Sequence, residues 1–122
     1  MTATSTVEGL RSELADGILR LTISRPRRMN AIDLATLSAL RDAVTAADAD
    51  TRVRTIVITG EGKAFCTGAD LAAGAANPQN PAVAMEATTG LIRAITDCSV
   101  PVIAAVNGPA AGVGVSIALV AD

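Results

Sequence analysis

The sequence predicts a single α/β domain, in which strand-like and helix-like segments alternate along the chain. Residues 7–14 and 17–23 have the pattern of a β-hairpin, with apolar and polar residues alternating in the second strand. A helical pattern at 34–47 lies between this hairpin and a strand-like run at 53–59. A helix between two strands indicates a crossover connection and therefore parallel pairing.

Local signals place the elements of the first half. Residues 1–6 are expected to be a frayed terminus, and residues 15–17 supply the hairpin turn. Asp33 stands where the N-cap of the 34–47 helix should be. The residues spaced to form the apolar stripe of that helix are Leu34, Leu37, Leu40, Val44 and Ala47.

The second half is predicted to continue the alternation. Residues 53–59 are largely β-branched, which is typical of a strand buried on both faces. Beyond Asp70 we expect a short turn of helix, and then a mobile loop over 72–81, which is rich in Ala, Gly, Asn and Pro. The remaining elements are a helix at 83–97, a buried strand at 100–106 and a buried, almost wholly apolar helix at 112–121.

The 83–97 helix needs an apolar face to pack on the rest of the domain. The residues expected to form it are Met85, Leu91, Ile92 and Ile95.

Composition excludes several classes of protein. The chain has 122 residues, half of them hydrophobic, which is enough for one packed core, although Phe65 is its single aromatic residue. A net charge of −2 argues against nucleic-acid binding. With no histidine and only two cysteines, which are not spaced as a CxxC pair, we expect no metal site.

The location of the protein can also be predicted. The residues before Leu10 are mostly small or polar, with Glu8 as their single charge, and do not resemble a signal peptide. Residues 99–121 carry no charge, as in a membrane span, but Pro101 and Pro109 divide this run into a strand and a helix. We therefore expect a cytoplasmic protein with reduced thiols and no membrane partner.

Two glycine-containing turns are the strongest functional signal. Residues 63–70 and 106–114 each follow a strand-like run, bend at glycines and enter a predicted helix. Such bends leave backbone N–H groups without intrahelical partners, and two bends facing each other would present two donors to one oxygen. The alternative is tight strand-to-helix packing without catalysis. A dinucleotide fingerprint is excluded because Ile117 replaces its third glycine, and no Ser or Thr follows Lys63 as a P-loop requires.

Three motifs, at residues 24–32, 63–71 and 105–114, resemble the crotonase superfamily, the enoyl-CoA hydratase/isomerase family. The resemblance covers residues 17–122. It implies the N-terminal portion of a crotonase-like spiral of ββα units. The domain over residues 1–122 would then be incomplete at its C-terminus, because members of the family run longer.

The resemblance also implies a site for acyl-CoA thioesters, with coenzyme A as part of the substrate and no permanently bound cofactor. The backbone amides of Ala69 and Val113 would form the oxyanion hole, in which Val113 stands where the family often has glycine. For Arg25, Arg27 and Arg28 the alternative is a solvated charged loop, and for Asp70 it is the N-cap of the turn that begins at Leu71. Cys66 is expected to be a small packing residue rather than a nucleophile. The positions implied for binding coenzyme A are Arg27, Arg28, Ala31, Gly68, Asp70 and Gly112.

One position departs from the family pattern. Ser116 occupies the place of the first glutamate of the hydratases and cannot serve as a carboxylate base. This favours isomerase-type chemistry, with one acid supplied from beyond Asp122, over hydration. The alternative is a non-catalytic acyl-CoA-binding or truncated member that lacks a general base. A homo-oligomer, trimer or hexamer, is expected from the resemblance, although the family's assembly elements are absent from these 122 residues.

Overall fold

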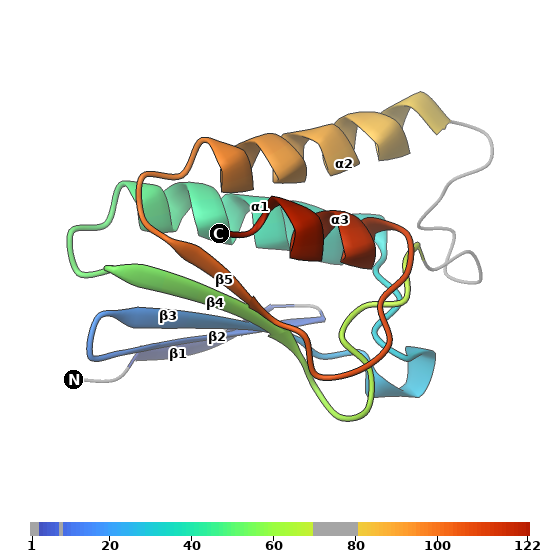
Figure 1. The fold of residues 1–122 in the computed structure, drawn as a ribbon, viewed down its shortest axis with the longest axis horizontal. Helices are drawn as coiled ribbons and strands as arrows, with labels where there is room; N and C mark the ends of the chain where they lie inside the picture. The colour runs from blue at the N-terminus through green and yellow to red at the C-terminus, as the bar shows by residue number, and fades with distance from the viewer. Residues whose placement is uncertain (1–2, 8, 70–80) are drawn as a thin grey trace.

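The computed structural model describes residues 3–7, 9–69 and 81–122. These residues form a five-stranded sheet in the order β1-β2-β3-β4-β5, with three α-helices lying over one of its faces (Figure 1). The elements are β1 (Ala3–Val7), β2 (Leu10–Ala15), β3 (Ile18–Ile23), the 3₁₀ helix η1 (Pro26–Arg28), α1 (Leu34–Asp48), β4 (Thr55–Gly60), α2 (Pro81–Thr96), β5 (Val102–Ala105) and α3 (Val113–Val120).

The pairing of the strands confirms the predicted crossover. β1, β2 and β3 pair antiparallel, whereas β3–β4 and β4–β5 are parallel pairs connected through α1 and α2. Asp16 and Gly17 both have positive φ, as the type I′ turn of a two-residue hairpin requires. The carboxyl ends of the three parallel strands therefore meet at one edge of the sheet.

The core lies between the sheet and the helices. Leu21 of β3 is paired with Ile58 of β4, and both side chains are fully buried. On the opposite face of the sheet, Ile18 and Ile103 are 45% and 47% exposed. The prediction that the 53–59 strand is buried on both faces is therefore wrong for the described residues, because all three helices lie on the same side (Figure 1).

The N-terminal segment is a second correction. Residues predicted to be a frayed terminus form β1, which pairs with β2 from Ala3↔Leu14 to Val7↔Leu10. The segment 7–14 is accordingly divided between two strands. The threonines and Val7 in β1 are β-branched residues that favour an extended backbone.

The first helix agrees with its prediction. The Asp33 side chain accepts a hydrogen bond of 2.8 Å from the amide of Thr36, which is the expected N-cap interaction. The helix ends at Asp48, one residue beyond the predicted end. The buried apolar residues in it are Leu37, Leu40, Val44 and Ala47, and Leu34 is partly buried.

The second and third helices agree only in part. In α2, Leu91 and Ile95 are buried with Ala87, and Ile92 is half-buried, but Met85 is 68% exposed. Positions 87, 91 and 95 follow one helical stripe, and Met85 lies off it.

In α3, Gly114 and Ile117 are buried, whereas Leu119 is 78% exposed, so this helix is not buried all round as expected. No helix among the described residues is long and apolar enough to cross a membrane. The short turn of helix predicted after Asp70, and the loop predicted over 72–81 as far as residue 80, lie outside the described residues.

One prediction concerns the junction between α1 and β5. The carboxylate of Asp48 accepts hydrogen bonds from the hydroxyl and the amide of Ser99, at 2.6 and 2.8 Å, and these bonds lower the pKa of Asp48. A carboxyl group with a lowered pKa in the folded state stabilises the fold above its unfolded pKa of about 4, and this contribution is lost as the pH falls through the folded value.

We therefore expect the difference in Tm between the wild type and Asp48→Asn to shrink as the pH falls below about 4. Thermal melts between neutral and acidic pH measure this difference. Asp97→Asn, which removes another exposed charge near the same loop, is the control. A difference that does not change with pH would contradict the assignment.

Candidate active site

Three segments lie side by side beyond the carboxyl ends of β3, β4 and β5. They are residues 29–32, residues 64–69 and residues 107–113, with the 64–69 segment in the middle. The parallel pairing of the three strands brings these loops to the same edge of the sheet (Figure 1). In open α/β sheets this edge is where ligands commonly bind.

Hydrogen bonds to backbone carbonyls join the middle segment to both neighbours. On one side, the amide of Ile32 donates to the carbonyl of Gly68 at 2.7 Å, and the hydroxyl of Thr67 donates to the carbonyl of Met29 at 3.0 Å. On the other side, the amide of Phe65 donates to the carbonyl of Pro109 at 3.0 Å.

The amide of Ala111 donates to the carbonyl of Cys66, also at 3.0 Å. The three segments therefore form a short ladder, which continues the order of the sheet beyond its regular strands.

Glycines allow the middle segment and the 107–113 segment to touch. Gly68 and Gly112 have φ of +106° and +55°, and a Cβ added to Gly112 would lie 3.3 Å from the Cα of Gly68. A Cβ on Gly114 would lie 2.0 Å from the carbonyl oxygen of Cys66. The two turns predicted to face each other are thus in backbone contact.

The two amides proposed for an oxyanion hole lie at this contact. Ala69 directly follows Gly68, and Val113 is the first residue of α3. No hydrogen bond within the described part of the chain uses either N–H group. The Val113 amide also lies at the positive end of the α3 dipole, where negative charge is favoured. The arrangement therefore suits an oxygen that gains negative charge.

The three arginines near the end of β3, Arg25, Arg27 and Arg28, have different surroundings in the structure. The guanidinium of Arg25 donates to the carbonyl of Ala31 and lies 3.6 Å from the carboxylate of Asp33, so it anchors this loop. Arg27 and Arg28 lie in η1 and are exposed. Ala31 contributes a backbone carbonyl to the Arg25 contact. Of the implied coenzyme A positions, Asp70 lies outside the described residues.

Two further candidate residues are Ser116, which lies in α3, and Cys66, which lies in the middle segment of the ladder. Ser116 follows Val113 by about one helical turn and is half-buried. Cys66 is fully buried, and burial raises the pKa of its thiol, which suits a packing residue rather than a nucleophile.

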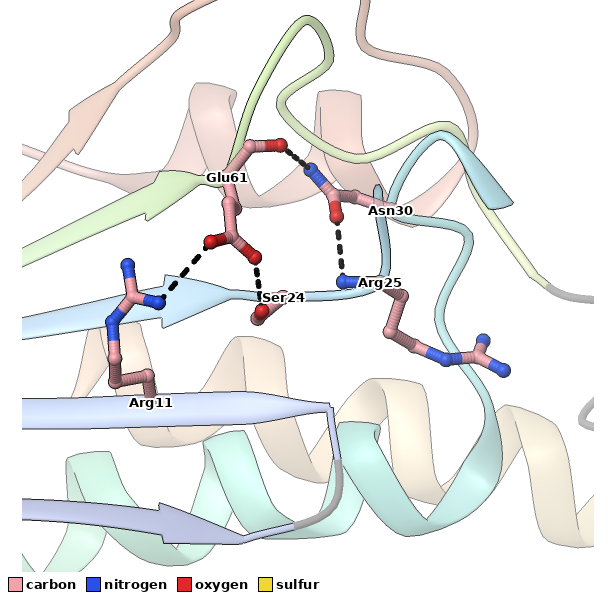
Figure 2. A network of polar contacts seen from close by, with 5 residues as sticks. All are labelled: Arg11, Ser24, Arg25, Asn30 and Glu61. Atoms are coloured by element: carbon pink, nitrogen blue, oxygen red, sulfur yellow. Dashed lines mark hydrogen bonds and ion pairs between the residues drawn. The ribbon is translucent and has the colours of Figure 1, made fainter. Parts of the chain in front are cut away.

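A polar network stabilises the start of the middle segment (Figure 2). The carboxylate of Glu61 accepts hydrogen bonds from the hydroxyl of Ser24 and from Arg11, at 3.3 Å to the latter, and these lower its pKa. Asn30 accepts from the amide of Arg25 at 2.8 Å and donates to the carbonyl of Glu61 at 2.9 Å. These contacts join the ends of β2, β3 and β4.

Asn30 and Asn107 are the residues that the sequence reasoning missed. Asn30 is completely buried, with a φ of 57°, and both asparagines donate to backbone carbonyls of residues 61–64. The available signal was the asparagine in each of two motifs, at 24–32 and 105–114.

Comparison with known proteins identifies the fold and the family of this chain. A crystal structure of an enoyl-CoA hydratase from Mycobacterium avium subsp. paratuberculosis superimposes with a TM-score of 0.87 at 37% identity, over 97% of this chain and 46% of that one. That structure and others like it have the crotonase fold. The family model for enoyl-CoA hydratase/isomerase matches residues 13–122, and the chain belongs to this family.

Curated relatives agree with that assignment. A probable enoyl-CoA hydratase of Rhodobacter capsulatus is 45% identical over 116 residues, which are 93% of this chain and 44% of that protein. The probable enoyl-CoA hydratase EchA14 of Mycobacterium tuberculosis is 42% identical over 105 residues, or 84% of this chain and 40% of that protein. The chain thus spans less than half the length of the curated relatives it matches.

The backbone contact of the two turns leads to a stability prediction. Gly114→Ala should cost about 1–3 kcal/mol or more, because the new Cβ meets a backbone carbonyl that cannot move aside. Gly90→Ala, also within a helix, places its Cβ 3.2 Å from the flexible side chain of Arg41 and should gain up to about 1 kcal/mol. Denaturant unfolding measures both changes. Equal effects of the two substitutions would contradict this contact.

Proposed function

We propose that the chain provides the thioester-binding part of an acyl-CoA enzyme. The observation that carries this proposal is the meeting of the Ala69 and Val113 amides at the glycine contact, where neither amide has a hydrogen-bond partner among residues 3–7, 9–69 and 81–122. Family membership supports an acyl-CoA substrate, since the relatives named above are enoyl-CoA hydratases.

In the proposed reaction the two amides hold the thioester oxygen. As the acyl chain loses a proton next to the carbonyl, negative charge develops on that oxygen, and both N–H groups donate to it. The α3 dipole adds to this stabilisation at Val113. Donors that are already in place need no reorganisation when the charge appears, which is why such sites lower the barrier.

The type of reaction is proposed from Ser116. A hydroxyl in the place of the first family glutamate cannot act as the second carboxylate acid or base that hydration requires. Moving a double bond needs a single carboxylate that carries a proton between two carbons, and this group would come from another part of the protein. We therefore favour isomerase-type chemistry, although the curated relatives named above are described as hydratases.

A second candidate function is acyl-CoA binding without turnover. Ser116 favours it as well, because a site with an oxyanion hole and no proton carrier would bind thioester without converting it. Calorimetry with crotonyl-CoA separates the two functions when it is combined with an activity assay on the full-length protein. Binding without turnover would support the second function.

Removal of one donor tests the oxyanion hole. Val113→Pro deletes the N–H, and proline is well tolerated at the first position of a helix, so the fold should be retained. We expect kcat to fall about 100- to 1,000-fold, whereas Val113→Ala, which keeps the N–H, should retain most of the activity. Steady-state kinetics measures both variants. Unchanged turnover in the proline variant would exclude this role for the Val113 amide.

Arg27 is proposed to contact the phosphates of coenzyme A. It is exposed in η1, and a guanidinium suits phosphate oxygens. Arg27→Gln should weaken the binding of free coenzyme A about two- to fivefold, as expected for an exposed ion pair.

Affinity for a pantetheine thioester, which lacks the nucleotide phosphates, should not change in this variant. Arg20→Gln, an exposed charge removal in β3, is the control, and titration calorimetry is the measurement. Equal losses in both variants would assign the effect to net charge.

A further inference from the structure

One backbone oxygen accepts hydrogen bonds from two asparagines of different segments. The carbonyl of Ala64 accepts from the Asn30 side-chain amide at 2.8 Å and from the Asn107 side-chain amide at 3.0 Å. Asn30 lies in the loop after β3, and Asn107 lies in the loop after β5. The Ala64 carbonyl therefore ties all three loops of the ladder together at its start.

Each asparagine is also held by other bonds, so its side chain has a defined orientation. Asn30 accepts from the Arg25 amide and donates to the Glu61 carbonyl (Figure 2). The carbonyl oxygen of the Asn107 side chain accepts from the amide of Gly60 at 3.1 Å, and its NH₂ group donates to the carbonyl of Gly62 at 2.9 Å. An amide side chain is needed at both positions, because each supplies an acceptor and two donated bonds.

From Ala64 to the proposed oxyanion donors, the ladder leaves the chain little freedom. Phe65 and Cys66 are bonded to Pro109 and Ala111, and Gly68 is bonded to Ile32. Ala69 follows Gly68 directly, and Val113 is two residues beyond Ala111. A displacement of Ala64 relative to either neighbouring loop is therefore transmitted along the ladder to the two amides.

We infer that Asn30 and Asn107 are positioning residues that set the relative placement of the Ala69 and Val113 amides through the shared Ala64 carbonyl. The inference rests on the proposed function, since it concerns the same oxyanion hole. Both asparagines act through the backbone and do not contact the substrate. Small errors in the placement of reacting groups lower the reaction rate strongly, so loss of either asparagine should reduce the rate.

Asn107 is the better residue for a test, because its side chain is exposed whereas Asn30 is completely buried. Asn107→Asp keeps the shape and the acceptor for Gly60, but it loses both donated bonds and turns a carboxylate oxygen toward two carbonyls. Ser99→Ala is the matched control. It removes the hydroxyl bond to Asp48 near the opposite end of β5, away from the ladder.

The experiment uses the full-length protein and crotonyl-CoA labelled with carbon-13 at the thioester carbonyl. Difference infrared spectroscopy measures how far binding lowers the carbonyl stretching frequency, which reports polarisation by the two amides. A role limited to holding the fold together would leave this frequency unchanged in a protein that still binds the probe. Steady-state kinetics on the same variants separates kcat from KM.

We expect the wild type and Ser99→Ala to lower the frequency equally, and Asn107→Asp to lose most of that shift. In Asn107→Asp, kcat should fall by up to about a hundredfold with little change in KM. An Asn107→Asp protein that keeps the full shift would overturn the inference and leave the oxyanion hole intact. Loss of the frequency shift in both Asn107→Asp and Ser99→Ala would also overturn the inference, because the effect would then not be specific to Asn107. If the wild type itself shows no shift, the proposed function fails and the inference fails with it.

Discussion

The structure depends on a contact between two backbones in which no side chain intervenes. A Cβ on Gly108 would lie 1.9 Å from the carbonyl oxygen of Lys63, and one on Gly114 would lie 2.0 Å from that of Cys66. With side chains absent at these points, amides and carbonyls of the two segments bond directly. The start of α3 is therefore fixed by backbone contact, which explains how this helix is held although Gly114 and Ile117 are its only fully buried residues.

Local patterns were enough to predict most of the fold. The N-cap at Asp33 and the stripe of α1 depend on residues close in sequence, and the parallel pairing of β3 with β4 follows from the order strand, helix, strand along the chain. The failures depend on partners far along the chain. Residues 3–7 become a strand because β2 offers them a free edge, and Met85 is exposed because α2 presents positions 87, 91 and 95 to its neighbours.

The parts of the candidate site that depend on glycine turns could be predicted from the sequence. The parts that depend on a particular backbone carbonyl as an acceptor could not. Glycines at tight turns are visible in a sequence, and they marked the two turns that the structure brings into backbone contact. Asn30 and Asn107 reach the Ala64 carbonyl across 34 and 43 residues. Since every residue has a carbonyl, nothing in the sequence marks this one as an acceptor. For the same reason, Arg25 could not be distinguished from its basic neighbours until its contact with Ala31 was known.

The burial of Cys66 in the middle of the ladder has a practical consequence. Its thiol is fully enclosed, and its carbonyl is the acceptor for Ala111. A thiol reagent can reach this sulfur only when the segments 29–32, 64–69 and 107–113 move apart. The rate of alkylation at Cys66 therefore depends on how often they separate.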